Sequence, residues 1–254
     1  MAEGGAERGA ALVTGGARRI GRALVTAAAD AGYDVAIHVR AVDDEAEAAA
    51  ADVRARGRKA AILACDLRKE ATTVALVGEA EAELGAVTLL VNSASVFDED
   101  AFADMNRASW DAHMETNLRA PLVLAQVFAR RLPADRNGLI VNLLDQRVLN
   151  PSPDFFSYAL SKAALWAATQ MLARALAPRI RVNGIGPGPT LPSIHQDQAA
   201  FQAEVGATLM GRPVSPAEIG AALRYLIDAP SVTGQMIAVD AGQHLAGKAG
   251  AWKR

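Results

Sequence analysis

The amino-acid sequence predicts an α/β fold, a single doubly wound domain in which a parallel sheet of about seven strands has helices on both faces. Short apolar runs alternate with helical stretches along the 254 residues, and strands that are joined through helices pair in parallel. A glycine-rich turn follows the first apolar run, as at the first strand of doubly wound sheets. No linker, repeat or low-complexity segment interrupts the pattern, so residues 1–254 are expected to form one domain.

The individual elements follow from apolar periodicity. The expected strands are the buried apolar runs at residues 10–14, 33–39, 59–64, 87–92, 138–144, 180–185 and 235–239. Helical patterns follow the glycine turn and recur at residues 43–56, 110–132, 155–176 and 216–227. Residues 187–213 are irregular and follow the sixth strand, which makes them a candidate substrate lid. We expect residues 1–9 and 248–254 to be flexible.

Composition excludes several classes of partner. Hydrophobic residues make up 51% of the chain, and 26 basic against 28 acidic side chains leave a net charge of −2, so no global field favours nucleic acid or an anionic membrane. Cys65 is the only cysteine, which excludes an intrachain disulfide and the usual zinc spacings, and we assign no metal. The first residues lack the apolar stretch of a signal peptide and no run is long enough to span a membrane, so a cytoplasmic location is expected.

The glycine-rich turn favours a dinucleotide. Gly15 and Gly21, with Ile20 beside them, leave backbone N–H groups and the start of the first helix open to a pyrophosphate. Alone this signal is weak, because glycines also make plain tight turns. Its place after the first strand of an alternating α/β chain strengthens it.

Arginines around this turn indicate which dinucleotide is bound. No acidic residue ends the second strand; His38 and Arg40 stand there, and the turn carries Arg18 and Arg19. Guanidinium groups at these positions match a 2′-phosphate, so the expected cofactor is NADP(H). In the competing interpretation the three arginines are solvated surface residues. His38 borders the expected cofactor site, and its imidazole, like that of His113, is expected to be structural.

Tyr158 and Lys162 are candidate catalytic residues. They are four apart in a predicted helix, so their side chains lie on one face and can meet. An ammonium beside a phenol favours the phenolate, and we expect it to lower the pKa of Tyr158 from about 10. The Tyr-x-x-x-Lys pattern also occurs by chance as a surface or packing pair.

Several short motifs follow one another along the chain: Thr14, Gly15, Gly21, Asp66, Leu67, Asn92, Ser93, Ala94, Asn117, Tyr158, Lys162, Pro187 and Gly188. With these motifs in the family's order, the chain resembles the short-chain dehydrogenase/reductase family from Leu12 to about Gly242. The resemblance implies a Rossmann-type fold, with Asp66 and Leu67 at the adenine and Lys162 on the nicotinamide ribose. It also implies that Asn117 supports a water in a proton relay, that Thr190 joins the cofactor site, and that the chain forms a homotetramer through its fourth and fifth long helices.

Two departures from the general family pattern point to its pteridine reductase branch. Arg19 replaces the middle glycine of the turn, and Asp145 stands thirteen residues before Tyr158, where the family has its serine. The chain is similar to that branch in both features and in a short polar segment followed by an aromatic residue, here Ser93, Ala94, Ser95 and Phe97. The resemblance implies a small heterocyclic substrate.

The chemistry of these residues suits a pterin. The ring of Phe97 and the nicotinamide could enclose a flat heterocycle, with Ser95 beside it, and Tyr158 and Asp145 could relay a proton to a ring nitrogen. An ionised carboxylate donates no hydrogen bond, so we expect Asp145 to keep a proton or to share one with Tyr158. In the competing interpretations Asp145 caps or pairs with nearby Arg147, and Phe97 packs under a loop.

The leading hypothesis is therefore an NADPH-dependent reductase of a pteridine. A second hypothesis is a carbonyl or sugar-alcohol dehydrogenase that tolerates aspartate at the serine position. A third is a non-catalytic protein that senses NADP.

Overall fold

Seven strands form one parallel sheet in the computed structural model, which describes residues 8–193 and 196–246. The strands are β1 (Ala10–Thr14), β2 (Asp34–Val39), β3 (Ala60–Ala64), β4 (Val87–Asn92), β5 (Gly138–Leu143), β6 (Ile180–Pro187) and β7 (Met236–Val239). Their order is β3-β2-β1-β4-β5-β6-β7, and every neighbouring pair is parallel. The predicted sheet is confirmed. The flexibility predicted for the two ends concerns segments that lie, except for Arg8 and Gly9, outside the described residues.

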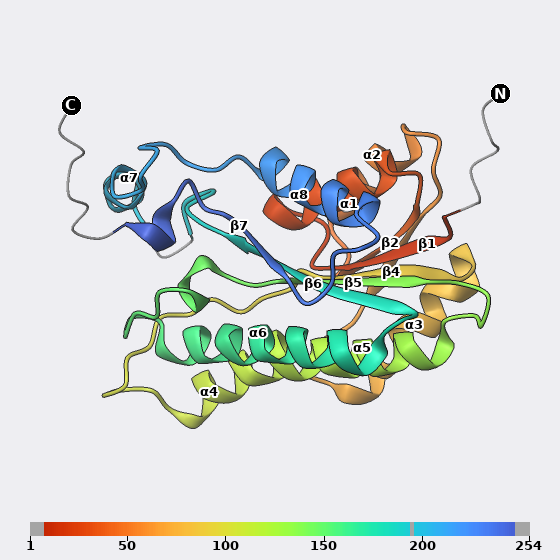
Figure 1. Ribbon diagram of the computed structural model, residues 1–254, viewed down its shortest axis with the longest axis horizontal. Coiled ribbons are helices and arrows are strands. Elements are labelled where there is room, and N and C mark those ends of the chain that lie inside the picture. The colour runs from red at the N-terminus through yellow and green to blue at the C-terminus, as the bar shows by residue number, and fades with distance from the viewer. Residues whose placement is uncertain (1–7, 194–195, 247–254) are drawn as a thin grey trace.

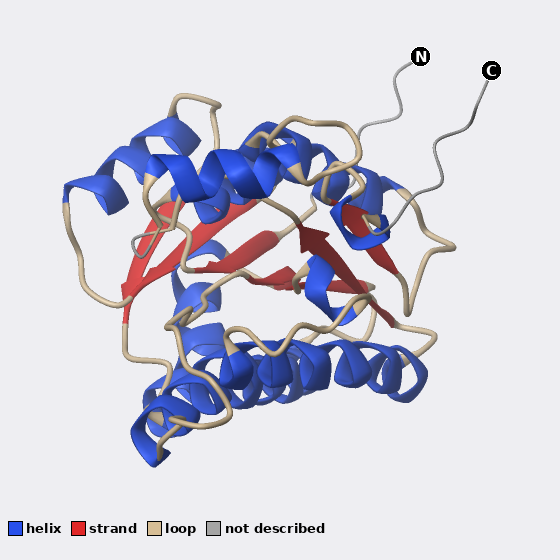
Figure 2. Ribbon diagram, turned by 90° about the vertical axis from the view of Figure 1, so that its left-hand side faces the viewer, coloured by secondary structure: helices blue, strands red, loops and turns tan. Residues whose placement is uncertain are grey.

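Helices cover both faces of the sheet, as predicted (Figures 1 and 2). One layer contains α1 (Arg19–Asp30), α2 (Asp44–Arg54) and α8 (Pro216–Asp228). The opposite layer contains α3 (Glu70–Leu84), α4 (Arg107–Met114), α5 (Ala120–Arg131) and α6 (Phe156–Leu176). The start of α8 illustrates how local sequence sets a boundary: Ser215 and Glu218 form a reciprocal capping box, and Pro216 supplies the first helical residue.

The core consists of two apolar clusters, one on each side of the sheet. Successive residues of a strand point to opposite faces, so Leu12 belongs to one cluster and Val13 to the other. Every residue of β4 and β5 is buried, which explains why the central strands read as continuous apolar runs rather than alternating ones.

The long helix predicted at residues 110–132 is interrupted. It begins earlier, at Arg107, and residues Glu115–Arg119 form a π-helical segment between α4 and α5. Pro121 has no N–H to donate to the carbonyl of Asn117, its α-helical partner, and the ladder widens so that Ala120 N–H donates to the carbonyl of Glu115. The π-helical segment contains Asn117, which the sequence analysis named as a candidate site residue.

The irregular stretch 187–213 contains a helix that the sequence analysis did not predict. In α7 (Gln198–Gly206) the side chain of Asp197 accepts from Ala200 N–H at 2.7 Å, and Phe201 and Val205, one turn apart, are buried. Two 3₁₀ turns, η2 (Gln146–Val148) and η3 (Gln243–Leu245), contact each other. Figure 1 shows α7 at the end of the molecule toward which β6 and β7 run.

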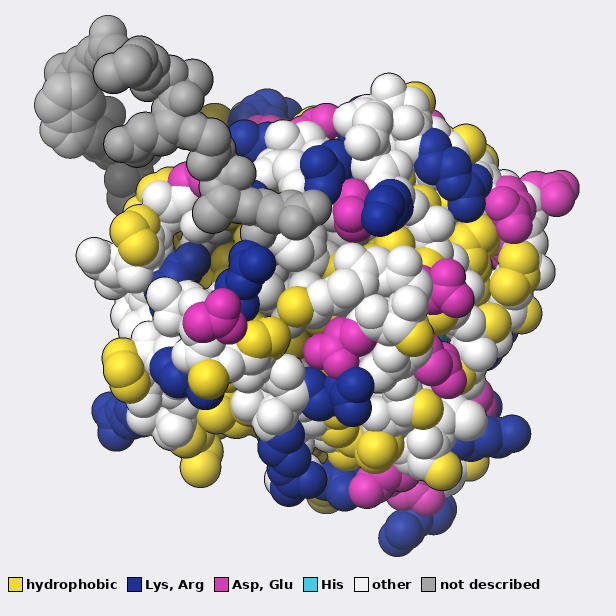
Figure 3. Space-filling view, turned by 90° about the vertical axis from the view of Figure 1, so that its right-hand side faces the viewer, with side chains coloured by type: hydrophobic (Ala, Val, Ile, Leu, Met, Phe, Trp, Pro, Cys, Tyr) yellow, Lys and Arg dark blue, Asp and Glu magenta, His cyan; other side chains and the backbone are white. Residues whose placement is uncertain are grey.

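The surface carries no large area of one charge sign on the face seen in Figure 3, where dark blue and magenta side chains are interspersed. This agrees with a net charge of −2. Within residues 8–193 and 196–246, no helix has the length and apolar character needed to cross a membrane.

The strand order reverses beside β1, whose two neighbours are β2 and β4. In open α/β sheets a crevice forms at this point, outside the carboxyl ends of the strands. The candidate site lies there.

Candidate active site

A cavity of about 770 Å³ lies at the carboxyl end of the sheet, lined by segments that follow β4, β5 and β6. The predicted site residues that line it are Arg19, Ile20, Arg40, Ser93, Ser95, Phe97, Asp145, Tyr158, Lys162, Pro187, Gly188 and Thr190. The others, which do not line it, are Gly15, Arg18, Gly21, His38, Asp66, Leu67, Asn92, Ala94 and Asn117. The candidate lid contributes Leu191, Ser193, Gln196, Phe201 and Glu204.

The turn between β1 and α1 is built for glycine. Gly15 has φ +64°, and a Cβ at Gly21 would lie 2.0 Å from the carbonyl oxygen of Gly15, so no other residue fits at position 21 without moving the turn. The first turn of α1 contains no acidic residue, and Arg18 at its N-cap makes no side-chain capping bond. The backbone N–H groups at this helix start are therefore left for an anion.

His38 links the glycine turn to the segment that follows β3. Its Nδ1 accepts from Gly15 N–H at 3.3 Å, and its Nε2 lies 3.1 Å from the carbonyl oxygen of Cys65. Burial lowers the pKa of His38, so the imidazole is neutral near pH 7 and donates from Nε2. A structural role for His38 agrees with the expectation.

The three arginines of the expected phosphate site do not converge. Arg18 forms an ion pair with Asp43, the N-cap of α2, and does not line the cavity. Arg19, at φ +51°, donates to the carbonyl oxygens of Leu191 and Pro192 at 3.0 and 2.9 Å. Arg40 is exposed and lines the cavity. Arg19 and Arg40 thus face the site, whereas Arg18 is held by an acidic neighbour that the sequence pattern did not account for.

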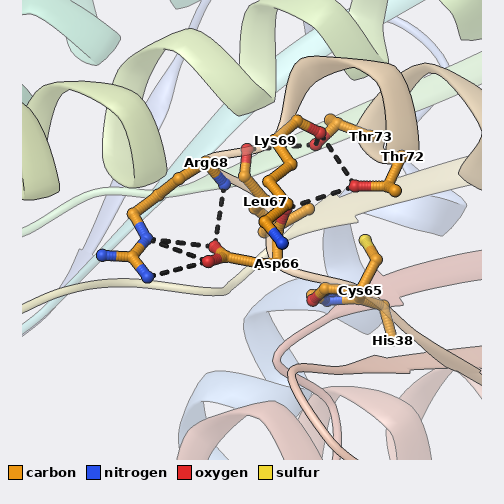
Figure 4. A network of polar contacts seen from close by, with 8 residues as sticks. All are labelled: His38, Cys65, Asp66, Leu67, Arg68, Lys69, Thr72 and Thr73. Atoms are coloured by element: carbon orange, nitrogen blue, oxygen red, sulfur yellow. Dashed lines mark hydrogen bonds and ion pairs between the residues drawn. The ribbon is translucent and has the colours of Figure 1, made fainter.

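Asp66 forms a tight network with its own loop (Figure 4). The guanidinium of Arg68 contacts both carboxylate oxygens of Asp66 at 2.7 to 3.2 Å, and Arg68 N–H donates to the same carboxylate. These bonds lower the pKa of Asp66 to about 2. Leu67 is buried, and its carbonyl accepts from Thr73 Oγ1. The adenine role of Asp66 and Leu67 stays a prediction, and Asp66 would share its carboxylate with Arg68.

The loop after β4 is fastened from β1 and from the neighbouring strand. Thr14 Oγ1 accepts from the N–H groups of Ser93 and Ala94 at 3.0 and 3.1 Å. Asn92 Nδ2 donates to Asn142 Oδ1 of β5 at 2.8 Å. These buried and partly buried bonds fix the point at which Ser93 meets the cavity.

Tyr158 donates from its hydroxyl to Asp145 Oδ2 at 2.8 Å. The other oxygen of Asp145 accepts from Arg147 N–H at 2.8 Å and caps η2. The two interpretations of Asp145, as a partner of Tyr158 and as a cap, are therefore both correct. Each carboxylate oxygen has its own partner.

Lys162 does not act on Tyr158 as predicted. Its Nζ donates to the carbonyl oxygen of Leu143 at 2.7 Å and lies 5.7 Å from the centre of the Tyr158 ring. Burial and the nearby carboxylate of Asp145 raise the pKa of Tyr158 well above its ordinary value, so the predicted lowering is wrong for this structure. Burial lowers the pKa of Lys162 to about 8.

Asn117 positions the loop beside the cavity. Its Nδ2 donates to the carbonyl of Val96 and to Ser161 Oγ at 2.9 and 3.0 Å. Its Oδ1 accepts from Val96 N–H and from Ser95 Oγ at 2.8 and 3.2 Å. The amide therefore makes all of its usual hydrogen bonds with protein. A role of Asn117 in a water relay stays a prediction, and it would have to use the backbone.

An aromatic wall that the sequence revealed only in part borders Tyr158. Phe97 and Phe155 stack with ring centres 4.3 Å apart, and Phe97 meets Tyr158 edge to face at 4.6 Å. The guanidinium of Arg147 lies 5.0 Å from the centre of Phe155 and 5.7 Å from that of Phe97. Phe155 has φ +54°, a costly conformation for this residue that only surrounding contacts maintain. Because Phe155 covers one face of Phe97, a substrate ring cannot stack on that face.

The candidate lid is tied to the rest of the chain through Glu204. Its two carboxylate oxygens accept from the side-chain amides of Gln196 and Gln243, both at 2.9 Å. All three residues line the cavity. The sequence analysis identified none of them, because amide and carboxylate side chains in an irregular stretch carry no local pattern.

Comparison with known proteins places this geometry in a family. Residues 9–203 match the model of the short chain dehydrogenases. The structure is similar to that of FolM alternative dihydrofolate reductase 1 from Brucella canis, complexed with NADP, with 45% identity and a TM-score of 0.91 over 97% of this chain and 98% of that one. It is also similar to a blue fluorescent protein from a metagenomic library in complex with NADPH, with 30% identity and a TM-score of 0.87 over 92% and 97% of the two chains.

Among curated proteins, the 3-oxoacyl-(acyl-carrier-protein) reductase FabG of Staphylococcus epidermidis is 31% identical over 179 residues, which cover 70% of this chain and 73% of the relative. The glycine turn, the buried Tyr158 and Lys162, and the seven-stranded parallel sheet agree with these matches. The chain belongs to the short-chain dehydrogenase/reductase family of oxidoreductases.

Proposed function

We propose that this protein is an NADPH-dependent reductase of a pteridine, a flat dihydropterin-like heterocycle. The observation that carries the proposal is the bond from the Tyr158 hydroxyl to Asp145 Oδ2 at 2.8 Å. The similarity to an alternative dihydrofolate reductase, at 45% identity over nearly the whole of both chains, supports it.

The residues around the glycine turn fit a phosphorylated dinucleotide. A Cβ at Gly21 would fill the space beside Gly15, and the open start of α1 supplies N–H donors for a pyrophosphate. Arg40 and Arg19 border the cavity and would face the 2′-phosphate, and Lys162 would hold the nicotinamide ribose. When bound, NADPH supplies the hydride.

Tyr158 holds the proton that the reduction needs. Its raised pKa keeps the phenol protonated near neutrality, and Asp145 orients that hydroxyl through Oδ2. Reduction of a ring C=N bond places a proton on nitrogen, and the Tyr158–Asp145 pair can share and deliver it. A developing alkoxide is a poorer match, because Asp145 Oδ2 is the acceptor in its bond with Tyr158 and gives no hydrogen to an oxyanion, unlike a serine hydroxyl.

A ketone reductase is the second candidate, and a specific observation favours it: the chain is 31% identical to a 3-oxoacyl reductase over 179 residues. The two candidates are separated by measuring NADPH oxidation with 7,8-dihydropterin, 7,8-dihydrofolate, acetoacetyl thioesters and simple ketones in parallel. We expect kcat/KM to be highest for the dihydropterins. A clear preference for the ketones would contradict the pteridine proposal, and NADPH binding without turnover of any substrate would favour a sensing protein.

We also propose that the chain assembles as a homotetramer through α4, α5 and α6. Leu160 and Met171 on α6 are 40% and 69% exposed, which is costly for apolar side chains in water. Light scattering with size-exclusion chromatography would measure the mass, and a monomer at micromolar concentration would contradict this assembly.

A further inference from the structure

Arg147 brings a cation to the wall of the cavity. Its guanidinium lies 5.0 and 5.7 Å from the ring centres of Phe155 and Phe97, and these two rings stack on each other. Arg147 also lines the cavity itself. The side chain is thus held by aromatic contacts rather than by a carboxylate, which leaves its N–H donors for another group.

One of those donors is buried and has no partner. Nη1 of Arg147 is inaccessible to solvent and makes no hydrogen bond, and within the described part of the chain Arg147 forms no ion pair. A buried donor without an acceptor is unfavourable, and more so when it carries a charge. The cost is removed if the guanidinium turns its donors toward an acceptor in the cavity that Arg147 lines.

The other basic side chains that line the cavity are assigned to the cofactor by the proposed function. Over the described residues, the basic side chains that line it are Arg19, Arg40, Lys162 and Arg147. The first three lie where the proposed function puts the dinucleotide. Arg147 is therefore the cation left for the substrate, and it faces a lining that also contains the carboxylates of Asp98, Glu99, Asp145 and Glu204.

The position of Arg147 relative to Tyr158 sets which part of the substrate it can reach. Phe97 contacts both side chains, edge to face with Tyr158 at 4.6 Å and beside the guanidinium at 5.7 Å. The charge of Arg147 is felt at Tyr158, where it opposes the rise in the pKa of the phenol. A bicyclic ring whose nitrogen meets Tyr158 would therefore present its edge, or a substituent on that edge, to Arg147.

We propose that Arg147 determines substrate specificity by donating an N–H of its guanidinium, which lines the cavity, to an oxygen acceptor on the flat substrate. The inference rests on the proposed function and deepens it: the preferred substrate is a dihydropteridine that carries a carbonyl or carboxylate oxygen within reach of Arg147. A charged donor strengthens such a bond. A ring without that oxygen leaves the buried donor unpaired, and it binds less well for that reason.

The test compares three substrates with wild type and Arg147→Met, all with NADPH. The substrates are 7,8-dihydropterin, its analogue without the ring oxygen, and the 6-carboxylate derivative of the same dihydropterin. In Arg147→Met we expect the KM for unsubstituted dihydropterin to rise about tenfold to a hundredfold, the loss of one charge-assisted hydrogen bond. The KM for the oxygen-free analogue should stay within about twofold, and kcat with all three substrates within about threefold. Arg174→Met, which removes an exposed arginine of α6, should leave every constant unchanged.

The 6-carboxylate derivative shows which oxygen of the substrate Arg147 binds. If the KM rises only for the 6-carboxylate, Arg147 binds that substituent; if it rises for both oxygen-bearing substrates, Arg147 binds the ring carbonyl. Arg147→Lys keeps the charge and should recover part of the affinity, and it carries the test if Arg147→Met melts at a lower temperature than wild type.

Two results would overturn the inference. One is a KM that rises equally for the oxygen-free analogue, which would mean that Arg147 only supports the aromatic wall. The other is an unchanged KM with a lower kcat, which would mean that Arg147 acts through Tyr158. Failure of wild type to reduce any dihydropterin contradicts the proposed function instead, so the two failures are distinguishable.

Discussion

The Tyr158 hydroxyl and the Asp145 carboxylate are joined by a 2.8 Å hydrogen bond in the lining of the cavity. Tyr158 is 6% exposed, so this bond is sheltered from water and stronger than it would be at the surface. In this contact the phenol is the donor and the carboxylate is the acceptor. Most of what is expected of this protein depends on that pair.

Asp145→Ser tests the pair directly. The substitution replaces an acceptor with a hydroxyl that can donate to an alkoxide. The kcat/KM for dihydropterin should therefore fall, and the kcat/KM for ketones should rise relative to that for dihydropterin. We expect kcat/KM for dihydropterin to fall on the order of 100-fold, the low end of what a positioned acid–base group contributes. Steady-state kinetics on both substrates measure the change. Asp154→Ser, an exposed carboxylate of the neighbouring loop, is the control, and an equal loss in both variants would argue against a role for Asp145.

Lys162 predicts how activity depends on pH. Burial lowers its pKa to about 8, so the ammonium loses its proton as the pH rises through 8, and the charged donor that the proposed function assigns to the nicotinamide ribose disappears. We therefore expect kcat/KM, which reports on the free enzyme, to be constant from about pH 6 to about pH 7.5 and to fall above about pH 8. Lys162→Arg keeps its charge over this range and should lose the alkaline fall while turning over more slowly. The same break in both proteins would assign it to another group.

Arg40 predicts the choice of cofactor. Its guanidinium lines the cavity, whereas Arg18 is paired with Asp43. Arg40→Ala should raise the KM for NADPH about tenfold to a hundredfold through the loss of charge-assisted hydrogen bonds, and leave the KM for NADH within about twofold. Arg18→Ala is the matched control and should change neither by more than about threefold. Similar effects on both cofactors would place the 2′-phosphate elsewhere.

The turn between β1 and α1 should require glycine at position 21. A Cβ there would lie 2.0 Å from the carbonyl oxygen of Gly15, so Gly21→Ala must displace the turn. We expect the melting temperature to fall by about 5 °C or more and NADPH binding to weaken, as for other overpacked sites. At Gly206, the last residue of α7, a Cβ meets no atom within 4 Å, and Gly206→Ala should not lower the melting temperature. Scanning calorimetry compares the two variants.

The sequence predicted the strands to within two residues, because a fully buried parallel strand is a continuous apolar run and little else in the chain resembles it. It also predicted the meeting of Asp145 and Tyr158. Their separation of thirteen residues runs from just after β5 to the first turn of α6, and the fold brings these two positions together. The helix α3 was not located, since it buries Leu76 and Val77 but exposes Val74 and carries no clean apolar stripe.

The remaining details of the site depend on contacts between distant loops. The partner of Lys162 is a backbone carbonyl, and side-chain patterns do not reveal backbone acceptors. Arg18 turns to Asp43, twenty-five residues away, because the start of α2 lies beside the glycine turn. The stacking of Phe155 on Phe97 requires the left-handed backbone at Phe155, a conformation that propensity does not predict for phenylalanine.

The grip of Gln196 and Gln243 on Glu204 joins three parts of the outer wall through one carboxylate. Both donors are amides, so the grip survives only while they stay amides. Hydrolysis of Gln243 to an acid would set two like charges at hydrogen-bond distance and push α7 away from η3, and hydrolysis of Gln196 would push α7 away from the segment that precedes it. The contact between α7 and η3 along the cavity wall thus depends on a single nitrogen, Nε2 of Gln243.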